Sequence, residues 1–315
     1  MGEQEVGISE ERKAQIGSIV FQDQIDIDKL GELAIQEILF SIKVYEHYHE
    51  QASNNNFEKN YQVLRNTVVN KLVKLQKLFF TLDKTSGFPF INGGCLDIYS
   101  EEAIAASAVD HYAQNRREQE VVDSSALYKD SNLADYLNIM GIERLRVDMG
   151  AYSTELDFKE LFDIEHKEMH STVNPKLRFA MIEFIQEAGG KKEYRGKADA
   201  LSQKEGKMIA EIKQASFLMP VILGSGKGNI SINYRQEQLL QPNAIQFAVM
   251  KGKNGRDYVP LFTDWIAFRK RYNPKEWQGT PIRLKDIRAF PSGKGIVINP
   301  EGENIAFDSK MISDL

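Results

Sequence analysis

The sequence has little cysteine and no long apolar run. Because Cys95 is the single cysteine, the chain can form no internal disulfide, which is typical of a protein in a reducing compartment. The longest apolar runs, such as FLMPVIL at 217–223, have the length of a strand and are too short to span a bilayer. The N-terminus lacks the basic segment and apolar core of a secretory signal. We therefore expect a soluble, cytoplasmic protein without a membrane partner.

Positive charge is not in excess either. The chain holds 40 Lys and Arg against 45 Asp and Glu, a formal net charge of −5 at pH 7. It therefore has no global surplus of cations with which to hold nucleic acid. A hydrophobic content of 42% with 27% charged residues is typical of globular proteins, and 315 residues are enough for two domains.

Residue spacing predicts several helices. Apolar residues recur at helical spacing over 27–50, and Asn56 is expected to cap a second helix that runs to about residue 75. Further along, Asn174 and Pro175 have the residue types of a helix start, and the glycine pair that begins at Gly189 is typical of a helix end.

Beyond residue 75, short apolar strands alternate with helices in two successive series. Each series has a strand that ends at a hydroxyl residue, Ser100 or Thr263, which is expected to cap the next helix. The segment 296–310 (IVINPEGENIAFDSK) has the same outline as 145–159 (LRVDMGAYSTELDFK), namely strand, turn, strand and helix start. Any α/β domain alternates in this way, but the shared order of elements favours a duplication. The predicted fold class is α/β, with an α+β mixed sheet.

Two motifs of the second series are the most specific. VPLFTD at 259–264 leads from a strand into a helix, and INPEGE at 298–303 precedes the last strand. With the surrounding order of elements, these motifs resemble the SseB N-terminal domain family. The resemblance covers 174–315, and a looser version covers 56–165, where Asp148 begins an Asp-Met-Gly turn in place of the Asn-Pro-x-Gly turn.

The resemblance implies a small α/β module that has no established catalytic centre. It predicts two tandem SseB-like modules, a divergent module 1 at 56–165 and module 2 at 174–315. Residues 1–55 would form an N-terminal helical extension, which includes the helix expected at 27–50. The family label implies a bacterial protein but does not define an activity, because a fold does not fix a function.

Two candidate sites have plainer interpretations. Asn299 and Glu303 could present a polar ligand site, but a turn between two strands is favoured, with Gly302 in a conformation that other residues avoid. Cys95 could be a nucleophile, but no base accompanies it, and a small buried core residue is the favoured interpretation.

Two further motifs fail their chemical tests. The segment 224–229 (GSGKGN) lacks both the first glycine and the final hydroxyl of a P-loop, so an exposed loop is favoured. His166 and His170 have the spacing of metal ligands on a helix, but Lys167 stands where the zincin pattern needs Glu, so solvated linker histidines are favoured. We therefore expect no catalytic centre, no metal and no cofactor.

A local excess of positive charge remains. Residues 251–294 hold eleven Lys and Arg against four Asp and Glu, with aromatic residues between them. The favoured interpretation places the aromatics inside and the cations on a solvated surface, where Arg269, Lys270 and Arg271 form a candidate interaction surface. An acidic protein partner fits this surface better than nucleic acid. The leading hypothesis is a non-catalytic protein-interaction or regulatory module, and the alternative is a small-molecule sensor or enzyme with a site between the two modules.

Overall fold

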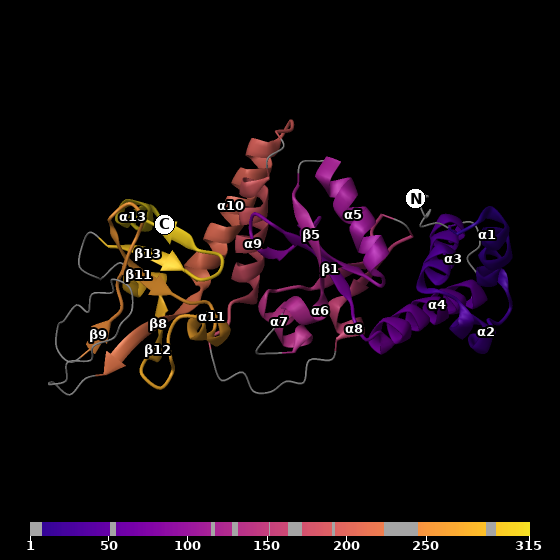
Figure 1. The fold of residues 1–315 in the computed structure, drawn as a ribbon, viewed down its shortest axis with the longest axis horizontal. Helices are drawn as coiled ribbons and strands as arrows, with labels where there is room; N and C mark the ends of the chain where they lie inside the picture. Colours follow the sequence, from indigo (N-terminus) through magenta and orange to yellow (C-terminus); the bar gives the residue numbers. More distant parts are fainter. Residues whose placement is uncertain are drawn as a thin grey trace. The chain divides into compact units, whose positions relative to one another are not determined.

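The computed structural model shows two compact units. It describes residues 8–50, 55–114, 117–127, 132–150, 152–162, 172–190, 193–223, 245–287 and 294–315. The N-terminal unit consists mainly of residues 1–164, and the C-terminal unit mainly of residues 165–315. Both contain helices and a mixed sheet, which confirms the α/β fold class (Figure 1). No helix within the described ranges is long and apolar enough to cross a membrane.

The N-terminal unit begins with packed helices. They are α1 (Glu10–Gly17), the 3-10 turn η1 (Ile19–Phe21), α2 (Ile27–Glu32), α3 (Ile35–Tyr48) and α4 (Asn55–Lys74). The prediction of one helix over 27–50 is wrong, because the backbone is extended at Leu33 and Ala34. The Glu37 carboxylate accepts the Ala34 N–H at 2.9 Å and starts a new helix there. Asn56 lies inside the first turn of α4 rather than capping it.

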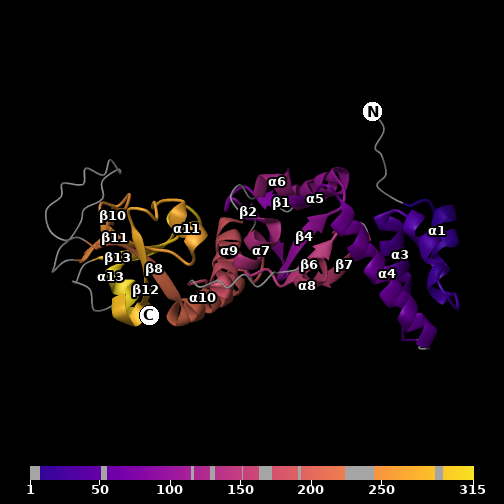
Figure 2. The same cartoon turned by 90° about the horizontal axis from the view of Figure 1, so that it is seen from below.

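Residues 79–161 form a seven-stranded sheet with short helices. The strands are β1 (Phe79–Asp83), β2 (Phe88–Pro89), β3 (Ile91–Asn92), β4 (Cys95–Tyr99), β5 (Gln119–Asp123), β6 (Arg144–Val147) and β7 (Thr154–Asp157). The helices are α5 (Glu102–Gln114), α6 (Ser124–Leu127), α7 (Leu133–Ile139) and α8 (Phe158–Leu161). The strand order is β2-β1-β4-β6-β7, with β3 on β4 and β5 on β1. Helix α5 lies beside β1 (Figure 2), and its buried residues pack with Phe90 and Tyr99.

The C-terminal unit opens with two long helices, α9 (Pro175–Gly189) and α10 (Lys197–Gln214). Its strands are β8 (Ser216–Leu223), β9 (Ile245–Phe247), β10 (Met250–Lys251), β11 (Asp257–Leu261), β12 (Gln278–Arg283), β13 (Gly295–Ile298) and β14 (Ile305–Phe307). Its other helices are α11 (Trp265–Arg269), α12 (Leu284–Ile287) and α13 (Ser309–Asp314). The strand orders are β12-β8-β9 and β10-β11-β13-β14, and a bridge between Leu218 and Phe262 joins them.

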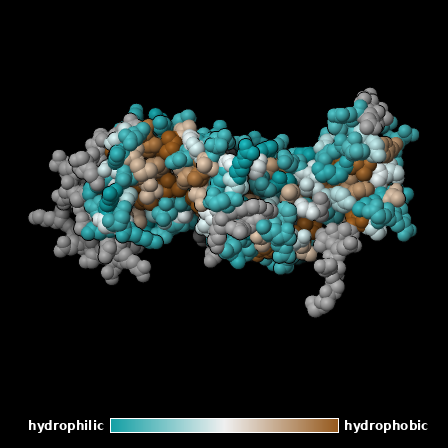
Figure 3. All heavy atoms as spheres, turned by 90° about the horizontal axis from the view of Figure 1, so that it is seen from above, coloured by the Kyte–Doolittle hydropathy of each residue, from teal (hydrophilic) through white to brown (hydrophobic). Residues whose placement is uncertain are grey.

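Apolar packing lies on both faces of this second sheet. Residues of α9 and α10, including Met181 and Ile212, pack with Val259 and other strand residues on one face. The other face holds Phe262, Phe268, Tyr272 and Trp277, which are buried as expected from the sequence, with Trp265 half-buried at the margin. Hydrophilic residues cover most of the face drawn in Figure 3, and apolar residues gather on its C-terminal unit.

The two units have the same strand pairings. In the N-terminal unit β1 pairs with β4 and β5, β4 runs parallel to β6, and β6 pairs antiparallel with β7. In the C-terminal unit β8 pairs with β12 and bridges the end of β11, β11 runs parallel to β13, and β13 pairs antiparallel with β14. A helix follows each of β4, β7, β11 and β14. This shared plan places corresponding residues at the ends of the parallel strands.

Candidate functional site

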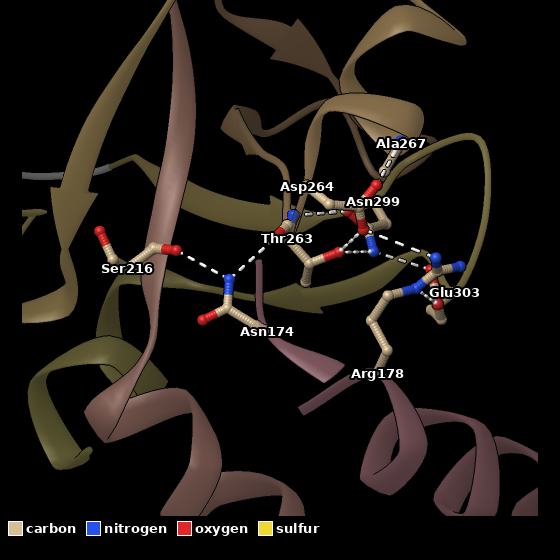
Figure 4. A network of polar contacts seen from close by, with 8 residues as sticks. All are labelled: Asn174, Arg178, Ser216, Thr263, Asp264, Ala267, Asn299 and Glu303. Atoms are coloured by element: carbon tan, nitrogen blue, oxygen red, sulfur yellow. Dashed lines mark hydrogen bonds and ion pairs between the residues drawn. The ribbon is translucent and has the colours of Figure 1, made fainter. Parts of the chain in front are cut away.

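The carboxyl ends of β11 and β13 carry a buried polar network (Figure 4). Adjacent parallel strands bring their carboxyl ends to one edge of a sheet, where α/β proteins commonly place their sites. Thr263 and Asp264 come after β11, and Asn299 comes directly after β13. The two ends are joined because the Asn299 N–H donates to the Leu261 carbonyl at 2.9 Å.

Asn299 organises this edge. Its φ of 49° lies in the left-handed region, which asparagine tolerates better than most residues. The Asn299 Oδ1 accepts the Thr263 N–H at 3.0 Å, and its Nδ2 donates to Thr263 Oγ1 and to Glu303 Oε2, each at 2.8 Å. The residues of this turn with positive φ are Asn299 and Asn304, so the expectation for Gly302 was wrong.

Arg178 of α9 completes the network. Its Nε donates to Glu303 Oε1 at 2.7 Å, and its Nη1 lies 3.5 Å from Asp264 Oδ2. Asp264 also accepts the Ala267 N–H at 2.8 Å and so caps α11, in place of the predicted cap Thr263. Asn174, at the start of α9, donates to the carbonyls of Ser216 and Thr263.

Burial decides what this network can do. Arg178 is 3% exposed, Asp264 1% and Glu303 5%. Their charged groups are paired with one another and hydrogen-bonded to Asn299 and Thr263, so the cluster presents no open face to a substrate. This arrangement supports the turn interpretation of Asn299 and Glu303, and it gives the cluster a structural role.

The N-terminal unit repeats the same geometry around Asp148. This residue directly follows β6, has a φ of 54°, and donates its N–H to the Ile98 carbonyl at 2.9 Å. The Ser100 N–H and hydroxyl each donate to the Asp148 carboxylate at 2.7 Å. The predicted cap Ser100 therefore binds Asp148, while α5 begins two residues later at Glu102.

Residues 195–314 match the family model of the SseB protein N-terminal domain. This stretch of the chain is therefore similar to an SseB N-terminal domain. The match confirms the resemblance seen in the sequence and covers the network residues after β11 and β13, whereas Arg178 precedes it. Comparisons with curated proteins and with solved structures returned no match.

The two networks differ in charge. Whereas Arg178 neutralises acids in the C-terminal unit, Asp148 meets the neutral amide of Gln36 in α3, whose Nε2 donates to Asp148 Oδ2 at 2.6 Å. Gln36 also accepts the Tyr152 N–H at 3.2 Å. Asp148 is fully buried and, within the described residues, has no salt bridge. Burial therefore raises the pKa of Asp148, against the hydrogen bonds that lower it.

This environment predicts that the stability of the fold depends on pH. A carboxyl whose pKa is higher in the folded state than its ordinary value of 3.8 binds its proton more tightly when folded. The free energy of unfolding of the wild type, compared with that of Asp148→Asn, should therefore increase as the pH falls from 7 toward 3.8. Urea unfolding of both proteins across this range measures the difference. A wild-type advantage that shrinks on acidification would instead place the folded pKa below 3.8.

A pocket opens beside Asp148 in the N-terminal unit. Its volume is about 320 Å³, and its walls come from the beginnings of α1, α3 and α5 and from Tyr152. Charged and amide side chains at the wall are Arg12, Gln36, Glu37 and Glu101. Sequence reasoning missed this pocket, because its walls come from distant parts of the chain, as the separation of 116 residues between Gln36 and Tyr152 illustrates.

The three predicted surface cations have different environments. Arg269 lies over the Trp265 ring, 5.9 Å from its centroid, and is exposed. Lys270 is exposed as well. Arg271 is half-buried and forms a salt bridge with Glu301. Arg269 and Lys270 thus remain as the open part of the candidate interaction surface.

Of the other sequence candidates, the structure describes Cys95. Cys95 is 1% exposed, and burial raises the pKa of its thiol, which disfavours the reactive thiolate. The described part of the chain contains no group of three or more His, Cys, Asp or Glu residues that could hold a metal ion. The segments with 224–229 and with His166 and His170 lie outside the described residues.

Proposed function

We propose that this protein is a non-catalytic interaction module, and that the surface around Arg269 and Lys270 binds an acidic protein partner. The observation that carries the proposal is the exposure of these two adjacent cations, for which the described residues supply no salt bridge. Residues 165–315 hold 24 Lys and Arg against 17 Asp and Glu, a formal charge of +7 on a chain that is acidic overall. A positive patch of this kind steers and orients a complementary acidic surface.

The half-buried Trp265 strengthens this surface. Its ring carries the Arg269 guanidinium, and its position is held by an edge-to-face contact with the buried Phe268, 5.0 Å between ring centroids. Arginine and tryptophan are enriched where protein interfaces hold most of their binding energy. A cation held on a rigid aromatic loses less side-chain entropy on binding than a free one.

A charge-reversal variant tests the proposal. Arg269→Glu with Lys270→Glu should abolish recovery of a partner that co-purifies with the tagged wild type at physiological salt, as identified by mass spectrometry. Arg271 is left unchanged, because reversing it would place two acids together at Glu301. The matched control is Lys207→Glu with Lys213→Glu, which makes the same charge change at exposed positions of α10. The proposal would be refuted if both variants recovered the partner equally, or if the wild type recovered no partner.

We also propose that the N-terminal unit is a divergent second SseB-like module at 56–165, in tandem with module 2 at 174–315, and that the protein acts in the bacterial cytoplasm. The shared strand pairings support the duplication, as do the matching positions of Asp148 and Asn299, both with positive φ after the second parallel strand. Gln36 of α3 serves the first network as Arg178 of α9 serves the second, so the duplicated unit would also include α3 from the predicted extension 1–55.

Small-molecule sensing is the second candidate function. The observation that favours it is the pocket of about 320 Å³ beside Asp148, which lies at the carboxyl ends of parallel strands β4 and β6. A cavity of this size lies at the lower end of the range of small-molecule pockets.

A further inference from the structure

The pocket of the N-terminal unit corresponds to a place in the C-terminal unit that the guanidinium of Arg178 fills. Glu101 follows Ser100 as Asp264 follows Thr263, and Tyr152 lies four residues after Asp148 as Glu303 lies four after Asn299. Asp264 and Glu303 contact the guanidinium of Arg178. Their counterparts Glu101 and Tyr152 instead line the open pocket.

We propose that this pocket binds an organic cation, a guanidinium or primary ammonium group on a short apolar stem. The cation would supply the positive charge that Arg178 brings to the C-terminal unit and that the neutral Gln36 does not, with its charge toward Glu101. The positive charge would thus come from the internal Arg178 in the C-terminal unit and from a bound ligand in the N-terminal unit.

The charges around the pocket favour this ligand. Arg12 is already engaged, since it forms a salt bridge with Glu37 and donates to Gln15. Glu101 is exposed and has no salt bridge within the described residues. The wall carries two carboxylates, Glu37 and Glu101, and one guanidinium, Arg12, a formal charge of −1 that favours a cation over an anion.

The rest of the wall suits an apolar stem. Ile104, Ala34 and the ring of Tyr152 line the same pocket. The Tyr152 ring is held by an edge-to-face contact with Phe40, 5.0 Å between centroids. The Lys13 ammonium, paired with Glu10, already lies over this ring, 5.9 Å from its centroid, so the apolar wall serves to shield methylene groups from water.

Isothermal titration calorimetry of the full chain with n-butylguanidinium tests the proposal. We expect a Kd of about 1 mM, which suits a ligand of this size, and no heat of binding from the neutral isostere n-butylurea. Glu101→Gln should weaken binding by about tenfold, because it removes a charged hydrogen-bond acceptor at the pocket. The matched control is Glu102→Gln, one residue further along at an exposed position that does not line the pocket, and it should leave Kd unchanged.

Two arms distinguish the sources of the cation. A blocked tripeptide with a central arginine that binds at least as tightly as n-butylguanidinium would indicate the side chain of a protein partner, and weaker binding would indicate a free small molecule. Equal Kd values for Glu101→Gln and Glu102→Gln, or equal binding of the guanidinium and the urea, would overturn the proposal. These variants lie in the N-terminal unit, so their outcome is independent of the Arg269 and Lys270 surface.

Discussion

Replacing Arg178 by Met is expected to destabilise the C-terminal unit by about 3–5 kcal/mol, the usual loss when one partner of a buried ion pair is removed. The substitution leaves Glu303 and Asp264 buried without their cation. Methionine is close to arginine in volume, so the loss reports the missing charge more than a missing volume.

Tryptophan fluorescence during urea unfolding measures this effect in the right unit, because Trp265 and Trp277 are the two tryptophans of the chain and both lie there. Lys176→Met is the matched control on the same helix at an exposed position, and its effect should stay within about 0.5 kcal/mol. Adding Glu303→Gln to Arg178→Met should restore part of the loss, because it removes one unpaired charge. Equal unfolding of the Arg178→Met and Lys176→Met proteins would show that the network does not stabilise the unit.

The succession of strands along the chain could be predicted from the sequence, because each strand is a short apolar run between turn residues. The start of α9 at Pro175 was as predicted, but the starts of α5 and α11 could not be predicted. Ser100 and Thr263 have the residue type of an N-cap, yet the hydroxyl and N–H of each bind a side chain that follows another strand, Asp148 or Asn299. A capping pattern covers four neighbouring residues, and it cannot show that a tertiary partner 36 or 48 residues away competes for the same groups.

The networks themselves had a weaker signal in the sequence. Arg178 and Glu303 are 125 residues apart, so no local spacing connects them. An arginine within the apolar stretch LRFAM of a predicted helix was the available clue, since a charge on a buried helix face needs a partner. The likeness of 145–159 to 296–310 did align Asp148 with Asn299. It could not show that their neighbours differ, which is why the pocket was not foreseen.

That difference between neighbours predicts the second large effect, from Asn299→Asp. An aspartate here still accepts the Thr263 N–H, as Asp148 accepts the Ser100 N–H. It cannot donate to Glu303 Oε2, which receives the Asn299 amide at 2.8 Å, and it sets a second carboxylate against Glu303 in a buried site. We expect a loss of about 3–5 kcal/mol in unfolding free energy, measured by tryptophan fluorescence in urea.

The double variant Asn299→Asp with Glu303→Gln separates the two causes of this loss. The introduced glutamine could donate to the introduced aspartate as Gln36 donates to Asp148, so the double variant would reproduce the arrangement of the N-terminal unit. Recovery of at least half of the lost stability would show that an aspartate is tolerated after the second parallel strand when its neighbour is an amide. No recovery would mean that residue 299 must be asparagine itself. The two networks would then share the positions of their residues but not the way in which their charges are balanced.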